Sequence, residues 1–379
     1  MAEDSTNIHR MKKFFGALAL AAVFLGAAVA AADDSNAPFK LGGIFSLSGY
    51  GAVGGQAELR GVELAVDEIN ASGGIKGHPI KIVVEDDRSD LKATAVAMHK
   101  LAAVDHVPVV IGPNWSEFAE VAADIAEQSK IVMLTPSGYT MTLTTNRPFV
   151  FSALENHGAA IKPLSDLIVS RKPTKVAVVL AENTFFRSLY DSIKPQLASG
   201  GISIWNTFTF NPGDDEFRSV ITKLKSEKVD AVIMLLLESG LDYQFLKQAK
   251  ELSLPAQIYS ADSIPYDEAL LKDLAVANGA IFFDYTVATS PEFKARYLAH
   301  FHSEAHSDSA RSYDLVYLLK QSVEECGASS DEIRECLTRL TLHGVSGDIS
   351  FDSSRNLKIL KPVSKLYTVQ DAKIVPFGS

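Results

Sequence analysis

Cysteine is scarce in this chain, which has only Cys326 and Cys336 among its 379 residues. No pair of histidines stands beside them at the spacing of zinc ligands, so the sequence disfavours a metal site there. The two cysteines lie between two stretches with helical periodicity. We expect them to form a disulfide that closes a helical hairpin in an oxidising compartment, and the alternative is two reduced thiols in the core.

Runs of basic residues are also absent. The chain carries 36 Lys and Arg against 46 Asp and Glu, a net charge of -10. A protein that binds the nucleic-acid backbone needs clustered positive charge, so we expect a small polar solute or another protein as the partner and no nucleic acid. The hydrophobic fraction of 47% and the charged fraction of 22% indicate a globular protein and exclude a disordered, collagen-like or coiled-coil chain.

One long apolar run stands near the N-terminus, at residues 14–30. It follows Lys12 and Lys13, ends in small residues and meets Asp33 and Asp34, which is the plan of a cleaved secretory signal. We therefore expect residues 1–32 to be a cleaved signal peptide and the rest of the chain to be exported. The alternative is an uncleaved membrane anchor. No cysteine follows the run, so nothing indicates a lipid anchor.

Enzyme signatures are missing as well: the sequence has no G-x-S-x-G elbow, Walker loop or catalytic cysteine pattern. His302 and His306 stand four positions apart but not as H-E-x-x-H, and we interpret them as a polar, exposed helix end. Residues 49–54 match G-x-G-x-x-G, yet the next acidic cluster, which begins at Glu85, comes too late for a ribose-binding acid. We expect a flexible glycine-rich loop, no catalytic residue and no cofactor.

Short β-branched runs alternate with amphipathic stretches along the chain. They predict strands at residues 40–45, 80–85, 107–111, 131–135, 149–153, 175–180, 202–210, 230–237, 257–260 and 280–285. They predict helices at residues 56–71, 91–104, 118–128, 188–198, 216–227, 243–252, 291–303, 310–325 and 331–340. This alternation is typical of an α/β fold with parallel sheets covered by helices on both faces.

The number of predicted strands exceeds the usual size of one parallel sheet, so we expect two lobes. The first lobe would comprise residues 38–156 with 287–360, and the second residues 157–286 with 361–379. Ligands of such sheets bind beyond the carboxyl ends of the strands. The residues that follow the predicted strands are therefore the candidates for a binding site.

Two strand ends of the first half are rich in small and hydroxyl residues. The segment 112–116 runs through Trp115 to Ser116, and the segment 135–140 contains Ser137, Gly138, Tyr139 and Thr140. Backbone N–H groups and hydroxyls at such turns form a cradle that can bind a carboxylate. The alternative is ordinary helix capping.

Two acids end strands in the second half, Glu238 and Asp262. A carboxylate opposite an anion cradle suits an ammonium or amide group, and the alternative is a solvated or helix-capping acid. The aromatic residues Trp115, Tyr139 and Phe185 are candidates for the apolar part of the site, although most aromatic side chains simply belong to the core.

Residues 49–77 carry a family resemblance. The run Asp67-Glu68-Ile69-Asn70, followed by Gly73-Gly74-Ile75 and Gly77, resembles periplasmic solute-binding proteins of branched-chain amino acid ABC importers, the leucine/isoleucine/valine-binding family. Further matches follow the second, third and fourth predicted strands, at residues 85–87, 110–112 and 135–137, and stand at residues 347–352. The resemblance covers residues 38–379.

The resemblance implies a type I periplasmic binding fold, in which two lobes joined by three crossing segments close on the solute. It implies that Ser116, Ser137, Gly138 and Thr140 hold the ligand carboxylate and that Asp262, where Glu is usual, receives the ammonium. This chain departs from the family pattern where a tyrosine matches Phe185, where another falls near Glu238 and where a tryptophan falls on Gly54. The departures favour a ligand other than leucine.

The function implied is a receptor without catalytic activity that passes an amino acid or related carboxylate, branched-chain or more polar, to membrane permease subunits. An alternative on the same fold is a sensor or importer receptor for amides, urea or aromatic carboxylates. An exported enzyme is the third reading, which the missing catalytic motifs disfavour.

Overall fold

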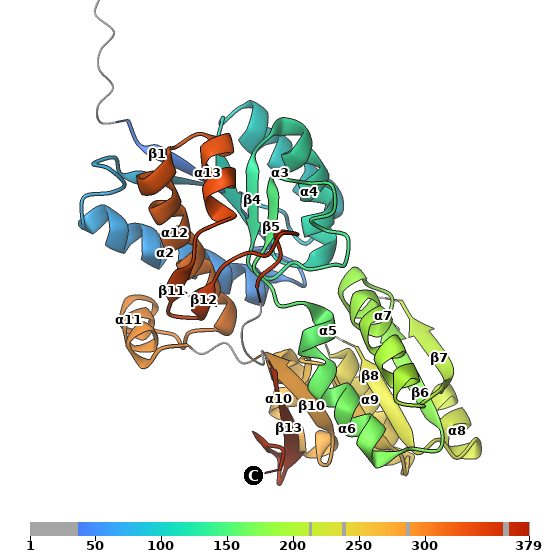
Figure 1. Cartoon of the computed structure of the whole chain (residues 1–379). Helices are drawn as coiled ribbons and strands as arrows, with labels where there is room; N and C mark the ends of the chain where they lie inside the picture. The colour runs from blue at the N-terminus through green and yellow to red at the C-terminus, as the bar shows by residue number, and fades with distance from the viewer. Residues whose placement is uncertain (1–36, 212–213, 237–239, 286–288, 359–363, 379) are drawn as a thin grey trace, which may run out of the picture.

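A computed structural model describes residues 37–211, 214–236, 240–285, 289–358 and 364–378. Figure 1 shows two lobes, one built mainly from the blue to green and the orange to red parts of the chain, the other mainly from the green to yellow-orange part. The expected signal peptide at residues 1–32 lies outside the described residues. Among the helices that the structure describes, none combines the length and apolar character needed to cross a membrane.

The first lobe holds a five-stranded parallel sheet. Its order is β2 (Ile80–Asp86), β1 (Phe39–Phe45), β3 (Val109–Ile111), β4 (Val132–Thr135) and β5 (Val150–Ser152). The buried residues of β1, β3 and β4 alternate between two hydrophobic clusters, so both faces of the sheet are covered. This explains why these strands read as continuous apolar runs rather than as alternating ones.

Different helices cover the two faces of this sheet. One cluster includes side chains of α2 (Ala52–Ala71), α11 (Pro291–Phe301), α12 (Ser307–Cys326) and α13 (Ser330–Leu337). The other includes side chains of α3 (Leu91–Ala103) and α4 (Ser116–Ser129). A small hairpin of β11 (Leu342–Gly344) and β12 (Gly347–Ile349) completes this lobe. Helices α2 and α4 therefore pack on opposite faces of the sheet.

The second lobe holds a seven-stranded sheet. Its order is β14 (Lys373–Pro376), β13 (Ser364–Gln370), β10 (Ile281–Tyr285), β9 (Gln257–Ser260), β8 (Ala231–Leu235), β6 (Val176–Ala181) and β7 (Ile204–Phe210). Its helices are α5 (His157–Ala160), α6 (Lys162–Arg171), α7 (Thr184–Ser199), α8 (Arg218–Ser226), α9 (Leu241–Glu251) and α10 (Glu268–Lys272), with two short 3-10 helices, Ile264–Tyr266 and Leu274–Ala277. One large hydrophobic cluster fills this lobe.

The predicted fold class is confirmed, and all ten predicted strands are present within a few residues of their expected bounds. Helices α5, α6 and α10 and strands β11 to β14 were not predicted from the sequence. The expectation of only parallel strands was also wrong, because β13 pairs antiparallel with β10 and β14 pairs antiparallel with β13. A hairpin needs only a short turn, so the C-terminal segment extends the sheet edge without another crossover helix.

A disulfide joins Cys326, the last residue of α12, to Cys336 in α13. Replacing both cysteines with alanine is expected to lower the free energy of unfolding by about 3 kcal/mol, because the unfolded chain regains the entropy of an open loop. Urea unfolding of the full chain, with and without a thiol reductant, measures this change in the free energy of unfolding. An unchanged transition midpoint in the double variant would show that the disulfide contributes no stability.

Candidate ligand-binding site

Ser116 connects two loops of the first lobe. It begins α4 after Trp115, whose backbone has a φ of 68°. The Ser116 hydroxyl donates to the carbonyl oxygen of Tyr139 at 2.9 Å and accepts from the Tyr139 amide at 3.2 Å. The side chain is buried. Ser116 therefore ties the loop after β3 to the loop after β4, and its hydroxyl already has a donor and an acceptor within the chain.

The other predicted carboxylate-binding groups also have partners within the chain. The Ser137 hydroxyl donates to Glu58 Oε1 of α2, whereas the Thr140 hydroxyl donates to Glu120 Oε1 of α4. The Gly138 amide donates to Thr135 Oγ1 at 2.8 Å. Since α2 and α4 cover opposite faces of the sheet, the two hydroxyls point in different directions. A ligand carboxylate would have to replace these partners, so the cradle stays a prediction.

Trp115 lies beside the glycine-rich loop at the start of α2. Its ring meets that of Tyr50 edge to face, with centroids 5.6 Å apart, and the Tyr50 hydroxyl donates to Glu117 Oε1 at 2.9 Å. A Cβ atom added at Gly54 would be 3.8 Å from Trp115 Nε1. The indole thus lies next to the position where the resemblance places a tryptophan, so an aromatic ring from a different loop reaches that region.

His157 brings two predicted aromatic residues together, although the sequence analysis did not single it out. Its ring centroid is 4.7 Å from that of Tyr139 in the first lobe and 4.7 Å from that of Phe185 in the second. Its Nδ1 lies 2.9 Å from Ser188 Oγ. Burial lowers the pKa of His157 to about 3, so the ring is neutral at physiological pH. Where the chain first passes between the lobes, His157 therefore contributes a neutral ring that contacts an aromatic residue of each lobe.

Asp262 follows β9 and lies near carboxylates of both lobes. Burial raises its pKa to about 8, and the negative charges of Asp284, Asp308 and Glu155 contribute. Asp284 belongs to the neighbouring strand β10, and burial raises its pKa to about 6. Asp308 stands in the first turn of α12, so Asp262 and Asp284 of the second lobe approach an acid of the first. Glu238, the other predicted acid, lies outside the described residues.

A buried ion pair supports the loop that carries Ser137. Arg311 of α12 donates to both carboxylate oxygens of Glu155, at 2.7 and 2.9 Å, and both side chains are buried. Arg311 also donates to the carbonyl oxygen of Pro136 at 3.3 Å. This arginine therefore positions the turn after β4, and its positive charge is paired with the Glu155 carboxylate. Nothing in the spacing of these residues along the chain indicates that they meet.

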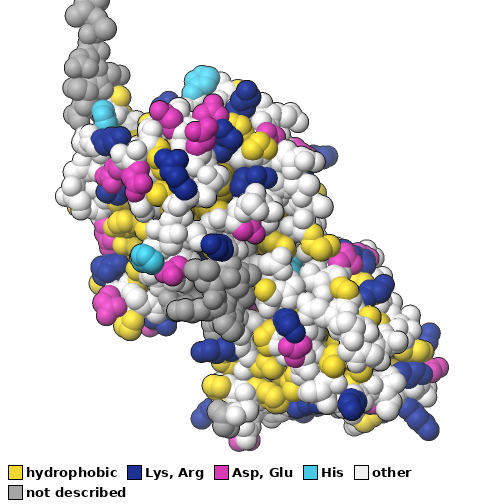
Figure 2. Space-filling view, in the orientation of Figure 1, with side chains coloured by type: hydrophobic (Ala, Val, Ile, Leu, Met, Phe, Trp, Pro, Cys, Tyr) yellow, Lys and Arg dark blue, Asp and Glu magenta, His cyan; other side chains and the backbone are white. Residues whose placement is uncertain are grey.

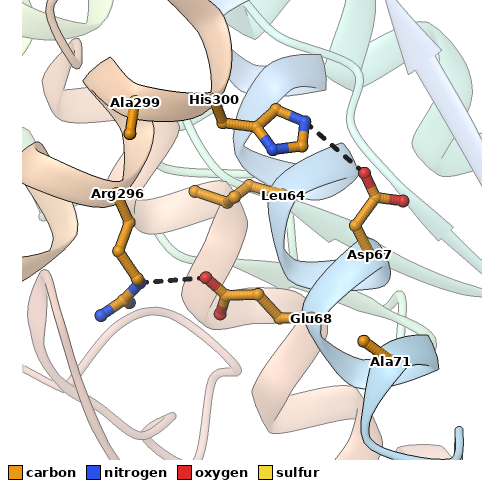
Figure 3. A pocket seen from close by; sticks show the side chains of 7 residues that line it. All are labelled: Leu64, Asp67, Glu68, Ala71, Arg296, Ala299 and His300. Atoms are coloured by element: carbon orange, nitrogen blue, oxygen red, sulfur yellow. Dashed lines mark hydrogen bonds and ion pairs between the residues drawn. The ribbon is translucent and has the colours of Figure 1, made fainter.

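A separate pocket of about 410 Å³ lies between α2 and α11. Figure 3 shows its charged side chains turned toward one another: Arg296 Nε is 2.9 Å from Glu68 Oε1, and His300 Nε2 is 3.6 Å from Asp67 Oδ2. None of the predicted site residues lines it. Because these charges are already paired, we keep the candidate site at the carboxyl ends of the two sheets.

Comparison with known proteins agrees with this architecture. Residues 38–370 match the family described as periplasmic binding protein. The chain belongs to the periplasmic binding protein family. The Leu/Ile/Val-binding protein BraC3 of Rhizobium johnstonii is 29% identical over 350 residues, which cover 87% of this chain and 94% of that protein. The predicted recognition of the family is confirmed, and this family consists of binding proteins rather than enzymes.

Two solved structures of periplasmic binding proteins illustrate the range of similar folds. A branched-chain amino acid transporter substrate-binding protein of Streptococcus pneumoniae, in complex with isoleucine, has a TM-score of 0.76 and 25% identity, covering 89% of this chain and 97% of that one. A solute-binding protein from R. palustris, in complex with benzoate, has a TM-score of 0.76 and 20% identity, covering 90% and 96%. The second likeness shows the fold alone.

Proposed function

We propose that this periplasmic binding protein is the receptor of an ABC importer and that it captures an amino acid between its two lobes. The observation that carries the proposal is Asp262, a half-buried acid at the carboxyl end of the second sheet that faces groups of the first lobe. The relatives support it, since their names describe binding of leucine, isoleucine and valine. The expected signal peptide at residues 1–32 would deliver the chain to the periplasm, where it meets permease subunits.

Capture follows from what each lobe offers. Asp262 receives the ligand ammonium, and a hydrogen bond to a charged group contributes about 1.5–3 kcal/mol. The loops at Ser116 and at residues 137–140 hold the carboxylate after exchanging their partners within the chain. The aromatic rings of Trp115, Tyr139 and Phe185 flank the apolar part. A ligand that touches both lobes only when they are closed binds that state more tightly and shifts the population toward it.

Isothermal titration with a panel of amino acids, benzoate and urea tests this proposal. We expect saturable binding of at least one amino acid. Binding restricted to compounds that lack an ammonium group would overturn the amino-acid reading and favour the receptor for amides or aromatic carboxylates. The acids around Asp262 argue against an aromatic carboxylate, because that solute would add a negative charge beside them without an ammonium group to offset it.

Amino-acid affinity is expected to rise with pH between about 6 and 8. Because Asp262 has a raised pKa of about 8, it is largely protonated at pH 6, whereas the ligand ammonium favours the carboxylate. Binding therefore expels a proton below pH 8, and affinity gains up to about tenfold per pH unit in this window. Titration in buffers of different ionisation enthalpy measures the proton release. Equal affinity at pH 6 and 8 without proton release would contradict the assigned role of Asp262.

A further inference from the structure

Several carboxylates of the described residues lie near one another where the two lobes face each other. Asp262 and Asp284 come from the second lobe, and both lie within range of the charge of Asp308 in the first. Burial raises the pKa of Asp242, at the start of α9, well above the usual range, and the charges of Asp267 and Asp262 add to this. Each added carboxylate makes the ionised form of its neighbours less favourable.

Among the described residues, the positive charge of Arg311 acts on Glu58 and that of His306 acts on Asp284. Arg311 donates hydrogen bonds to both carboxylate oxygens of Glu155, so its charge is already paired. His306 caps α12, and its Nδ1 is 3.2 Å from Asp308 Oδ2. Burial works against its charged form, yet the carboxylates of Asp308 and Asp284 raise the pKa of His306. The earlier interpretation of His302 and His306 as one exposed helix end is wrong, because His302 ends α11 while His306 begins α12 and is partly buried.

Glu58 adds an independent geometric observation, a buried carboxylate oxygen without a hydrogen-bond donor in the described part of the chain. It lies on the inner side of α2 and is 0% exposed. Its Oε1 accepts from Ser137, but its Oε2 is buried with no hydrogen-bond partner among the described residues. Burial raises the pKa of Glu58 well above its usual range, and the nearest charges acting on it include Asp308 and Arg311. A buried carboxylate oxygen without a donor is costly unless a ligand supplies one.

We propose that the solute carries a second positive charge in its side chain, so that it is a basic amino acid. Asp262 receives the α-ammonium, and Asp284, Asp308 and Glu58 attract the cationic side chain. In the described part of the chain, no group of three or more His, Cys, Asp or Glu side chains is arranged to hold a metal ion. This inference rests on the proposed function as an amino-acid receptor.

Two pairs of nearly isosteric ligands test the charge directly. Lysine and norleucine differ by the terminal ammonium, and arginine and citrulline differ by the guanidinium charge. We expect isothermal titration of the full chain to show at least tenfold tighter binding of the charged member of one pair. Norleucine or leucine binding as tightly as lysine, and citrulline as tightly as arginine, would overturn this inference and leave the amino-acid receptor intact. Binding of benzoate but of no amino acid would overturn both.

Putrescine distinguishes a basic amino acid from a diamine as the ligand. A diamine has two ammonium groups but no carboxylate, so we expect it to bind at least tenfold more weakly than the basic amino acid. Binding of putrescine with no binding of lysine, ornithine or arginine would mean that the solute is a diamine, which contradicts the basic amino acid proposed here.

Variants of the acids locate the site of discrimination. Asp284→Asn and Glu58→Gln are each expected to reduce the ratio of affinities for the charged and neutral ligands at least fivefold. Glu63→Gln, on the same helix α2 as Glu58, should leave the ratio unchanged. Asp284→Asn keeps the test decisive if the buried Glu58 variant fails to fold. An unchanged ratio in Asp284→Asn would contradict the proposal.

Discussion

Replacing Asp262 with asparagine is expected to weaken amino-acid binding by about two orders of magnitude. The substitution keeps the size of the side chain and removes the negative charge that the ligand ammonium requires. Loss of one partner of a desolvated, hydrogen-bonded charge pair costs about 2–5 kcal/mol, and 1.4 kcal/mol corresponds to a tenfold change in affinity. Isothermal titration with the tightest amino acid of the panel measures the effect.

Asp273→Asn provides the matched control for this variant. Asp273 follows α10 in the same lobe and is exposed, so its substitution should leave affinity within a factor of two. Both variants replace an aspartate with an asparagine, so they differ only in the position that is changed. If Asp262→Asn bound the amino acid as tightly as the wild type, Asp262 would not be part of the binding site. It could then not be the group that receives the ligand ammonium.

Replacing Arg311 with methionine is expected to lower the free energy of unfolding by about 3–5 kcal/mol. Arg311 and Glu155 are 4% and 5% exposed, so removing the guanidinium leaves a buried carboxylate without its counter-ion. The hydrogen bond to the Pro136 carbonyl oxygen is lost as well. Urea unfolding, followed by circular dichroism, measures the change in stability.

The double variant Arg311→Met with Glu155→Gln separates charge from packing. Because it removes both charges, it should be more stable than Arg311→Met alone, by an amount that a double-mutant cycle reports. Equal stability of the single and double variants would mean that the buried pair acts mainly through the shape of its side chains.

The distribution of charge over the surface agrees with a receptor for a small solute. Figure 2 shows Lys and Arg side chains interspersed with Asp and Glu side chains over the described part of both lobes on the face in view. The acids that concern the ligand are instead less exposed: Asp262 and Asp284, at the carboxyl ends of β9 and β10, are half-buried, and Glu58 of α2 is buried. Selectivity then depends on desolvated groups rather than on the general acidity of the chain.

The fold could be predicted from the sequence because its signal is local. Strands such as β6 and β8 are continuous apolar runs, and each is followed by an amphipathic stretch of helical period. The C-terminal strand β13 could not be recognised in the same way, because its residues form neither a continuous apolar run nor a regular alternation and no helix follows. Its pairing partner β10 is far away in the sequence, so only the tertiary structure reveals the antiparallel register.

The candidate site was harder to predict because its partners are distant in sequence. Residue types at the strand ends drew attention to Ser137 and Asp262, but nothing local indicates that the Ser137 hydroxyl meets Glu58, 79 positions earlier. The pair of Arg311 and Glu155 spans 156 positions. The residue types at the ends of predicted strands therefore identify candidate binding groups. Which charged side chains surround those groups depends on the helices that pack against them in the folded protein.

Closure of the two lobes on an amino acid is the central claim, and small-angle X-ray scattering tests it most directly. The radius of gyration of the full chain should fall when the amino acid identified by titration is added to saturation. At a ligand concentration of about ten times the wild-type Kd, it should fall much less in Asp262→Asn, whose affinity is expected to be about 100-fold lower. A radius of gyration that stays constant while titration shows wild-type binding would contradict capture between the lobes.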